Sequence, residues 1–129
     1  MTGNPAPWPD LNLTPWALIG TGGFCGSVLH YTINAVFSTL PGTLIVNTLG
    51  SVLMGIFMFE SMATGRFSRH ARMLIGIGFL GAFTTFSGLA LIAVEQPPVV
   101  AAVYVAATLL LGLFGILLGR TIVGLHGRR

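Results

Sequence analysis

The sequence predicts an all-α integral membrane protein with four transmembrane helices. Only 7% of the 129 residues are charged, 53% are apolar, and the mean hydropathy is +0.88. A soluble domain carries about 25% charged residues, so this composition excludes an ordinary soluble enzyme, a disordered chain and a nucleic-acid module. The second observation is a series of four long, almost uncharged stretches, each close to the roughly 20 helical residues that cross a bilayer. These spans are expected at about residues 16–40, 42–62, 73–94 and 98–120.

The segments outside the spans are short and polar. Residues 1–14 form a Pro-rich tail that lacks the basic start of a signal peptide. Thr14 followed by Pro15 is typical of the start of a helix. We therefore expect one channel-like domain over residues 15–122 and a basic tail over 123–129.

The positive charges predict how the spans are oriented. All six are arginines, and they follow the second and fourth spans: Arg66, Arg69, Arg72, Arg120, Arg128 and Arg129. Four spans place both termini on one side, and the positive-inside rule then predicts cytoplasmic termini. An alternative use of the basic loop at 64–72 is a lipid-headgroup site.

Polar residues inside the spans require a partner, because lipid offers none. The glycines are explained by close helix packing, whereas Asn47 needs several hydrogen-bond partners and fits either packing or a pore. The single cysteine, Cys25, excludes a disulfide framework and a CxxC metal site.

The centre of the third span carries three glycines and three hydroxyl residues within GFLGAFTTFSG at 78–88. Glycine and β-branched threonine weaken a helix. A break here would free main-chain groups for protein contacts or for an ion. An intact helix, with hydroxyls bonded to carbonyls one turn earlier, remains an equal alternative.

The polar groups of the spans favour a small anion. No acidic or basic residue lies well inside them, and a proton-coupled transporter normally needs one; His30 is the exception and is typical of a packing residue. Amide and hydroxyl donors can replace water around an anion, and a Phe ring has a positive edge.

The chain resembles the Fluc (CrcB) fluoride channels over about residues 17–120. The matching motifs are GGFCGS at 22–27, GTLIVN at 42–47 with Gly50, and GFLGAFTTFS at 78–87. The resemblance implies a passive, fluoride-selective channel of the prokaryotic plasma membrane that exports cytoplasmic fluoride and so lowers its toxicity. It also implies an antiparallel dimer with two pores, a third helix broken at mid-membrane, and no enzymatic activity.

The resemblance assigns roles residue by residue. The fluoride path would be lined by Asn47, Thr85, Phe86, Ser87, Tyr104 and Thr108. A structural Na⁺ at the dimer interface would be held by the backbone carbonyls of Gly81 and Thr84.

Three positions depart from the family pattern. His30 stands where the family usually has Arg, and Gly88 and Leu89 stand where it usually has Thr and a second Phe. Phe83 lies one turn earlier, at a variable position, and is not taken as the missing ring. Leucine has no positive ring edge, so the pore that contains Leu89 should hold fluoride less well.

These departures and the arginine bias predict a single membrane orientation and an antiparallel partner of different sequence. This chain would then be a structural subunit with a degenerate pore, although a homodimer remains open. A small multidrug transporter is excluded by the lack of an acid in the span 16–40, and a holin-like pore former does not call for a broken helix.

Overall fold

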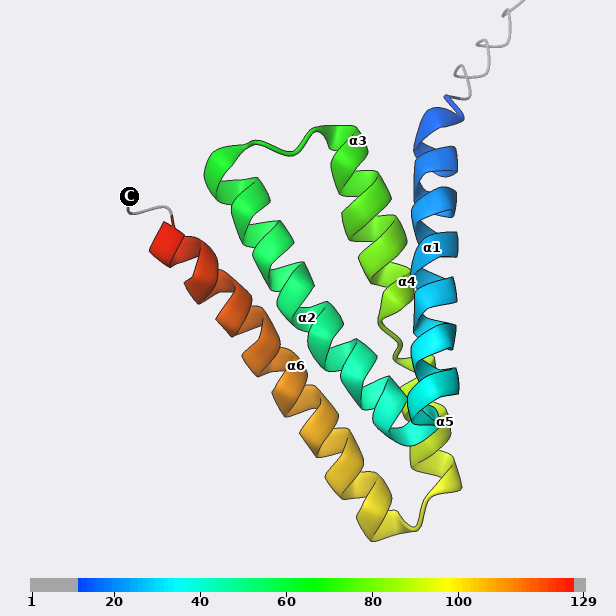
Figure 1. Cartoon of the computed structure of the whole chain (residues 1–129). Helices are drawn as coiled ribbons and strands as arrows, with labels where there is room; N and C mark the ends of the chain where they lie inside the picture. Colours follow the sequence, from blue (N-terminus) through cyan, green and yellow to red (C-terminus); the bar gives the residue numbers. More distant parts are fainter. Residues whose placement is uncertain (1–11, 127–129) are drawn as a thin grey trace, which may run out of the picture.

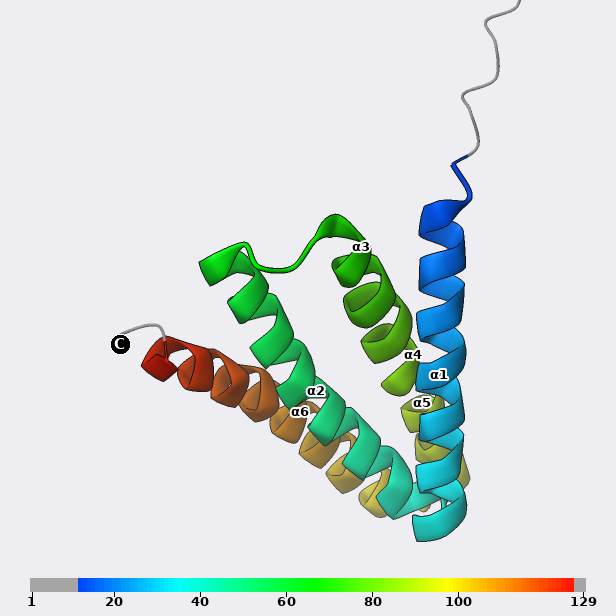
Figure 2. The same ribbon diagram turned by 45° about the horizontal axis from the view of Figure 1, so that its top comes forward.

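The computed structural model describes residues 12–126, which are helical except at short links (Figure 1). The elements are α1 (Thr14–Phe37), α2 (Thr39–Thr64), α3 (Arg69–Ala71), the π-helical η1 (Arg72–Leu80), α4 (Gly81–Phe83), α5 (Ser87–Glu95) and α6 (Pro98–His126). The chain descends through α1, returns through α2, descends from α3 to α5 and returns through α6 (Figures 1 and 2). The all-helical class is thereby confirmed for the described part.

Two pairs of elements carry most of the packing. α6 runs alongside α2 in the same direction, and η1 lies against α1 (Figure 1). Both contacts are made through glycines, which allow the close backbone approach that membrane helices use. A Cβ on Gly119 would lie 2.5 Å from the Ile56 nitrogen, and a Cβ on Gly22 would overlap the Leu74 carbonyl oxygen.

Helix boundaries differ from the expected spans at the first link. α1 ends at Phe37 and α2 begins at Thr39, so Leu40 lies in α2 instead of closing the first span. Ser38 alone links the two helices, with φ 62° and ψ 163°. Pro41 fits within the first turn of α2, where its missing N–H is not needed.

The remaining helices extend beyond the expected spans. α2 continues to Thr64 and closes on Gly65 in the left-handed conformation (φ 62°), the usual end of a helix. The third helical segment begins at Arg69, where the Ser68 hydroxyl accepts the Ala71 N–H at 3.2 Å. α6 runs on to His126.

Within residues 12–126, three helical segments have the length and composition of a membrane span. They are Thr39–Thr64, Arg69–Glu95 and Pro98–Leu125, with mean hydropathies of 1.7, 1.9 and 2.4. α1 has 24 residues, but its glycine, hydroxyl, histidine and asparagine residues lower its hydropathy, and it is not among the three.

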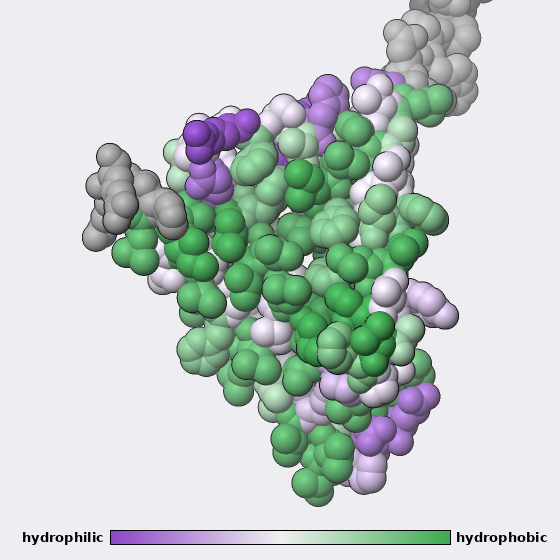
Figure 3. All heavy atoms as spheres, viewed as in Figure 1, coloured by the Kyte–Doolittle hydropathy of each residue, from purple (hydrophilic) through white to green (hydrophobic). Residues whose placement is uncertain are grey.

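The molecular surface is the one expected of a chain surrounded by lipid. Hydrophobic side chains cover most of the face in Figure 3, and hydrophilic ones gather at the end where α2 is linked to α3 and, in a second group, toward the opposite end. Phe24, Phe114 and Val94 are 71%, 67% and 85% exposed. At the basic end, Arg66 pairs with Glu60 at 3.5 Å and Arg120 lies 5.6 Å from the centre of the Phe59 ring. Arg128 and Arg129 lie outside the described residues.

Candidate functional site

The helical backbone is interrupted between α4 and α5. α4 ends at Phe83, Thr84 is extended (φ −90°, ψ 155°), and α5 begins at Ser87. An interruption inside an apolar helix frees main-chain groups that must find new partners. Side chains from α1, α2 and the interruption itself supply those partners.

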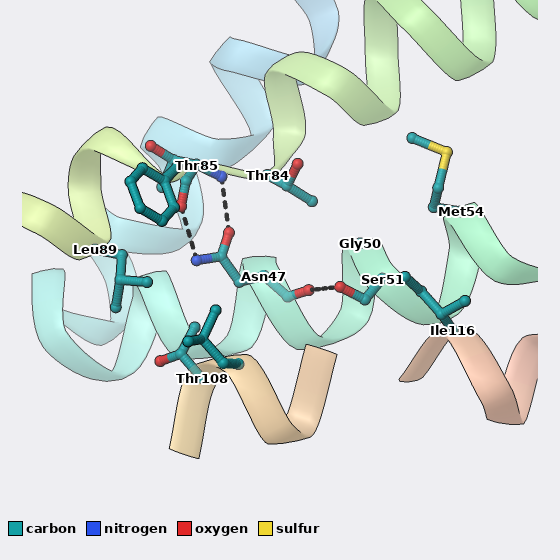
Figure 4. Close-up of a pocket in the computed structure, with 11 residues that line it drawn as sticks. Asn47, Gly50, Ser51, Met54, Thr84, Thr85, Leu89, Thr108 and Ile116 are labelled. Carbon is teal, nitrogen blue, oxygen red and sulfur yellow. Dashed lines mark hydrogen bonds between the residues drawn. The ribbon is translucent and has the colours of Figure 1, made fainter. Parts of the chain in front are cut away.

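Asn47 of α2 binds the main chain of Thr85 with both ends of its amide (Figure 4). Its Nδ2 donates to the Thr85 carbonyl at 2.9 Å, and its Oδ1 accepts the Thr85 N–H at 2.7 Å. The side chain is only 8% exposed, so both bonds are shielded from competing water. Asn47 thus holds Thr85 out of the helix by taking the place of helical partners.

The Thr85 hydroxyl caps the N-terminus of α5. It accepts the Gly88 N–H at 2.9 Å, the bond that a capping threonine makes, and it lies 3.2 Å from the Ser87 hydroxyl. A Cβ at position 88 would lie 2.8 Å from Thr85 Cγ2. Gly88 therefore gives the Thr85 side chain the room that it needs to cap α5.

These bonds leave two carbonyls without their helical donors. In a continuous helix, Gly81 O would accept the Thr85 N–H and Thr84 O would accept the Gly88 N–H. The first of these N–H groups donates to Asn47 and the second to the Thr85 hydroxyl. The two carbonyl oxygens sit at the C-terminal end of α4, where the helix dipole favours positive charge.

Several of the expected pore residues lie around one pocket of about 320 Å³ beside the interruption (Figure 4). Its walls are Asn47, Gly50, Ser51, Met54, Thr84, Thr85, Phe86, Leu89, Thr108, Leu109 and Ile116. All of these side chains are uncharged, and they come from α2, α5, α6 and the interruption. The pocket therefore combines an amide, hydroxyls and a ring within an apolar surround.

Two expected pore residues lie elsewhere. Ser87 lines a second, polar hollow of about 290 Å³, together with Ser27 and His30 of α1. The Tyr104 hydroxyl donates to the Leu40 carbonyl at 2.7 Å and so links α6 to the first turn of α2.

The two positions of the expected aromatic pair differ in exposure. Phe86 is 76% exposed and projects from the interruption, whereas Leu89 is 3% exposed and packs against Ile92 and Tyr104. Leu89 also forms part of the pocket wall, so its side chain contributes apolar surface there.

Sequence reasoning did not assign two residues of this region to the site. Ser51 lies one turn after Asn47 and shares its polar helix face by spacing, but it was not predicted as a pore residue; it lines the pocket and donates to the Asn47 carbonyl at 2.7 Å. His30 bonds the Phe83 carbonyl at 2.9 Å across 53 positions of sequence, and no local pattern predicts that contact.

Apolar helices packed through glycines around an uncharged polar pocket define a helical integral membrane protein. The chain belongs to the CrcB family, because the family model described as CrcB-like protein, Camphor Resistance (CrcB), matches residues 17–120. The resemblance recognised from the motifs is thereby confirmed.

Curated relatives agree with this assignment. The chain is 45% identical over 113 residues to "Fluoride-specific ion channel FluC 1" of Methanospirillum hungatei, covering 88% of this chain and 80% of that relative. It is 38% identical over 112 residues to FluC 2 of Methanosarcina barkeri, covering 86% and 89% of the two chains. FluC 1 of Haloarcula marismortui is 37% identical over 117 residues, which cover 91% of each chain.

Proposed function

We propose that this protein is a passive fluoride-selective channel, and not an enzyme, that exports cytoplasmic fluoride and lowers its toxicity. The observation that carries the proposal is the Asn47–Thr85 amide clamp, which opens an apolar helix beside an uncharged pocket. A relative that shares 45% identity over 113 residues is named a fluoride-specific ion channel.

The donors available to an anion can be counted from the hydrogen bonds. The Ser51, Thr84 and Thr108 hydroxyls donate to the carbonyls of Asn47, Leu80 and Tyr104. Their protons are therefore used within the chain, and they offer an anion only lone pairs. The Tyr104 hydroxyl likewise donates its proton to the Leu40 carbonyl.

Three groups still have a hydrogen or a positive ring edge that can contact fluoride. Asn47 Nδ2 carries two hydrogens, of which Thr85 O uses one. Thr85 and Ser87 share one hydrogen bond, so one of their two hydroxyl protons stays free whichever residue donates. Phe86 supplies a ring edge. We infer that fluoride exchanges water for these donors along the pocket and the second polar hollow, both of which Thr85 lines.

We further propose that a structural Na⁺ binds the carbonyls of Gly81 and Thr84. These two carbonyl oxygens fit this ion as ligands, because both have lost their helical N–H partners and Na⁺ prefers oxygen ligands. The bound cation would supply positive charge at the C-terminal end of α4.

The arrangement in the membrane is part of the proposal. α1 would cross the bilayer as the first of four spans, and the interruption at 84–86 would lie at mid-membrane. Two antiparallel subunits would form the channel in a prokaryotic plasma membrane, with the termini of this chain in the cytoplasm. An inside-negative potential drives anion exit with about 2.3 kcal/mol per 100 mV.

Fluoride efflux tests the proposal directly. Liposomes loaded with fluoride and containing the purified chain should release it within seconds to minutes after a K⁺ ionophore relieves the charge imbalance, as read by a fluoride electrode. Matched liposomes loaded with chloride should release almost none. Equal efflux of the two anions would contradict fluoride selectivity, and no efflux would contradict conduction by this chain alone.

A non-conducting subunit of a heterodimeric channel is the second candidate. Two observations favour it: Leu89 is packed inside the chain where a second ring would be expected, and the described arginines all lie in or beside the link from α2 to α3 or near the C-terminal end of α6. In this case efflux would appear only when a sibling chain with the opposite arginine bias is reconstituted together with this one.

A single orientation is the corresponding prediction for this chain. With Cys25 replaced by Ser, a cysteine added at the C-terminus should be protected from a membrane-impermeant thiol reagent in intact spheroplasts and labelled in inverted membrane vesicles, because the basic segments resist translocation. Lysed cells give the total labelling as the control. Equal labelling from both sides would contradict a fixed orientation and favour a homodimer.

A further inference from the structure

His30 joins α1 to the interrupted helix through a single carbonyl. Its Nδ1 lies 2.9 Å from the Phe83 carbonyl oxygen, at the last residue of α4. A carbonyl only accepts, so Nδ1 carries the proton and donates it. Without this bond, Phe83 O would be a further carbonyl freed at the same helix end, since α5 begins only at Ser87.

The second ring nitrogen fixes this tautomer. Asn34 Nδ2, one turn further along α1, lies 2.9 Å from His30 Nε2. An amide nitrogen only donates, so Nε2 accepts and the ring's one proton stays on Nδ1. A Cβ on Gly42 would overlap Asn34 Oδ1, so the Asn34 side chain is seated tightly against α2.

We propose that His30 is a positioning residue that determines which carbonyls at the interruption remain open to a cation. It occupies Phe83 O and leaves the oxygens of Gly81 and Thr84, whose N–H partners are bound by Asn47 and Thr85. It does so with an uncharged donor, so it adds no repulsion toward a cation nearby. The inference rests on the proposed Na⁺ site of the proposed channel.

Two substitutions separate the two ring nitrogens. In His30→Asn, the side-chain amide nitrogen can occupy the position of Nδ1 and still donate to Phe83 O. In His30→Gln, the amide lies near the position of Nε2, so the contact with Asn34 is kept and the donor to Phe83 O is lost. The two variants are similar in polarity, and a merely space-filling role for His30 would not distinguish them.

The readout is the Na⁺ dependence of thermal unfolding in detergent, with choline as the replacement cation. We expect the half-saturating Na⁺ concentration to rise at least about tenfold in His30→Gln and to stay within about threefold of wild type in His30→Asn, as the loss or retention of one buried hydrogen bond implies. Asn34→Leu removes the amide that donates to Nε2, so either ring nitrogen of His30 can carry the proton. This variant should raise the half-saturating Na⁺ concentration about threefold, and it replaces His30→Gln as the test if that variant does not fold.

The outcomes distinguish this inference from the proposed function. Equal half-saturation in wild type, His30→Gln and Asn34→Leu would overturn the role of His30, as would equal rises in His30→Gln and His30→Asn. A wild-type chain that conducts fluoride but gains no stability from Na⁺ would overturn both the Na⁺ site and this inference while leaving the channel intact. Fluoride efflux from the same preparations measures the channel separately.

Discussion

Asn47→Asp is expected to reduce fluoride efflux at least about a hundredfold. The substitution replaces Nδ2, which donates to the Thr85 carbonyl at 2.9 Å, with an oxygen that repels it. It also removes the second N–H that the pocket offers to an anion and places a like charge at a side chain that is only 8% exposed. An unsatisfied buried group costs about 1–3 kcal/mol, and about 3 kcal/mol on a barrier corresponds to roughly a hundredfold in rate.

The measurement is fluoride efflux per reconstituted protein, and the chain offers a matched control one residue away. The buried Thr48 hydroxyl lacks a hydrogen-bond partner, so Thr48→Val keeps the shape and removes a polar group that contributes no bond. We expect Thr48→Val to leave efflux within about twofold of wild type, since it removes no paired group. Efflux retained in Asn47→Asp would show that Asn47 is not part of the conduction path.

The sequence was sufficient for the class of fold and for the family. Long apolar stretches without charge require helices in a membrane, and GTLIVN and GFLGAFTTFS at fixed positions indicate the family, which the match over residues 17–120 confirms. The glycines and threonines at 78–88 indicated a place where a helix could break, but they left an intact helix as an equal alternative.

The contacts that hold the helix open between α4 and α5 could not be predicted from local sequence. The Asn47 amide replaces the helical partners of Thr85 from 38 positions away, and His30 reaches Phe83 from 53 positions away. Such contacts depend on how α1 and α2 pack on the third helical segment, and a periodic pattern carries no information about that packing.

The partner to which each hydroxyl donates its proton could not be predicted from the sequence either. Tyr104 and Thr108 fit a polar fourth helix by residue type, yet both donate their protons to backbone carbonyls within the chain. The pore roles predicted for these two residues therefore remain predictions. The Thr108 hydroxyl can only accept hydrogen bonds in the pocket. Donor accounting needs partner geometry, which residue type alone does not provide.

Gly22→Ala is expected to destabilise the folded protein strongly. A Cβ at position 22 would overlap the Leu74 carbonyl oxygen and lie 2.9 Å from the Phe79 nitrogen, and both are backbone atoms of η1 that cannot turn aside. α1 would have to separate from η1, which removes the close packing that holds membrane helices together. Overpacking of this kind costs about 1–3 kcal/mol or more, a large part of a marginal stability.

Gly20→Ala, two residues earlier on the same helix, separates this packing effect from the general effect of alanine in a helix. A Cβ at position 20 meets no atom within 4 Å, so only helix propensity changes, in favour of alanine by about 1 kcal/mol. We expect Gly20→Ala to elute as the wild type does in size-exclusion chromatography in detergent, with an equal or higher Tm, and Gly22→Ala to aggregate or unfold at least about 10 °C lower. Equal behaviour of the two variants would show that α1 is not held against η1 through Gly22, and the contact between α1 and the interrupted helix would lose its main support.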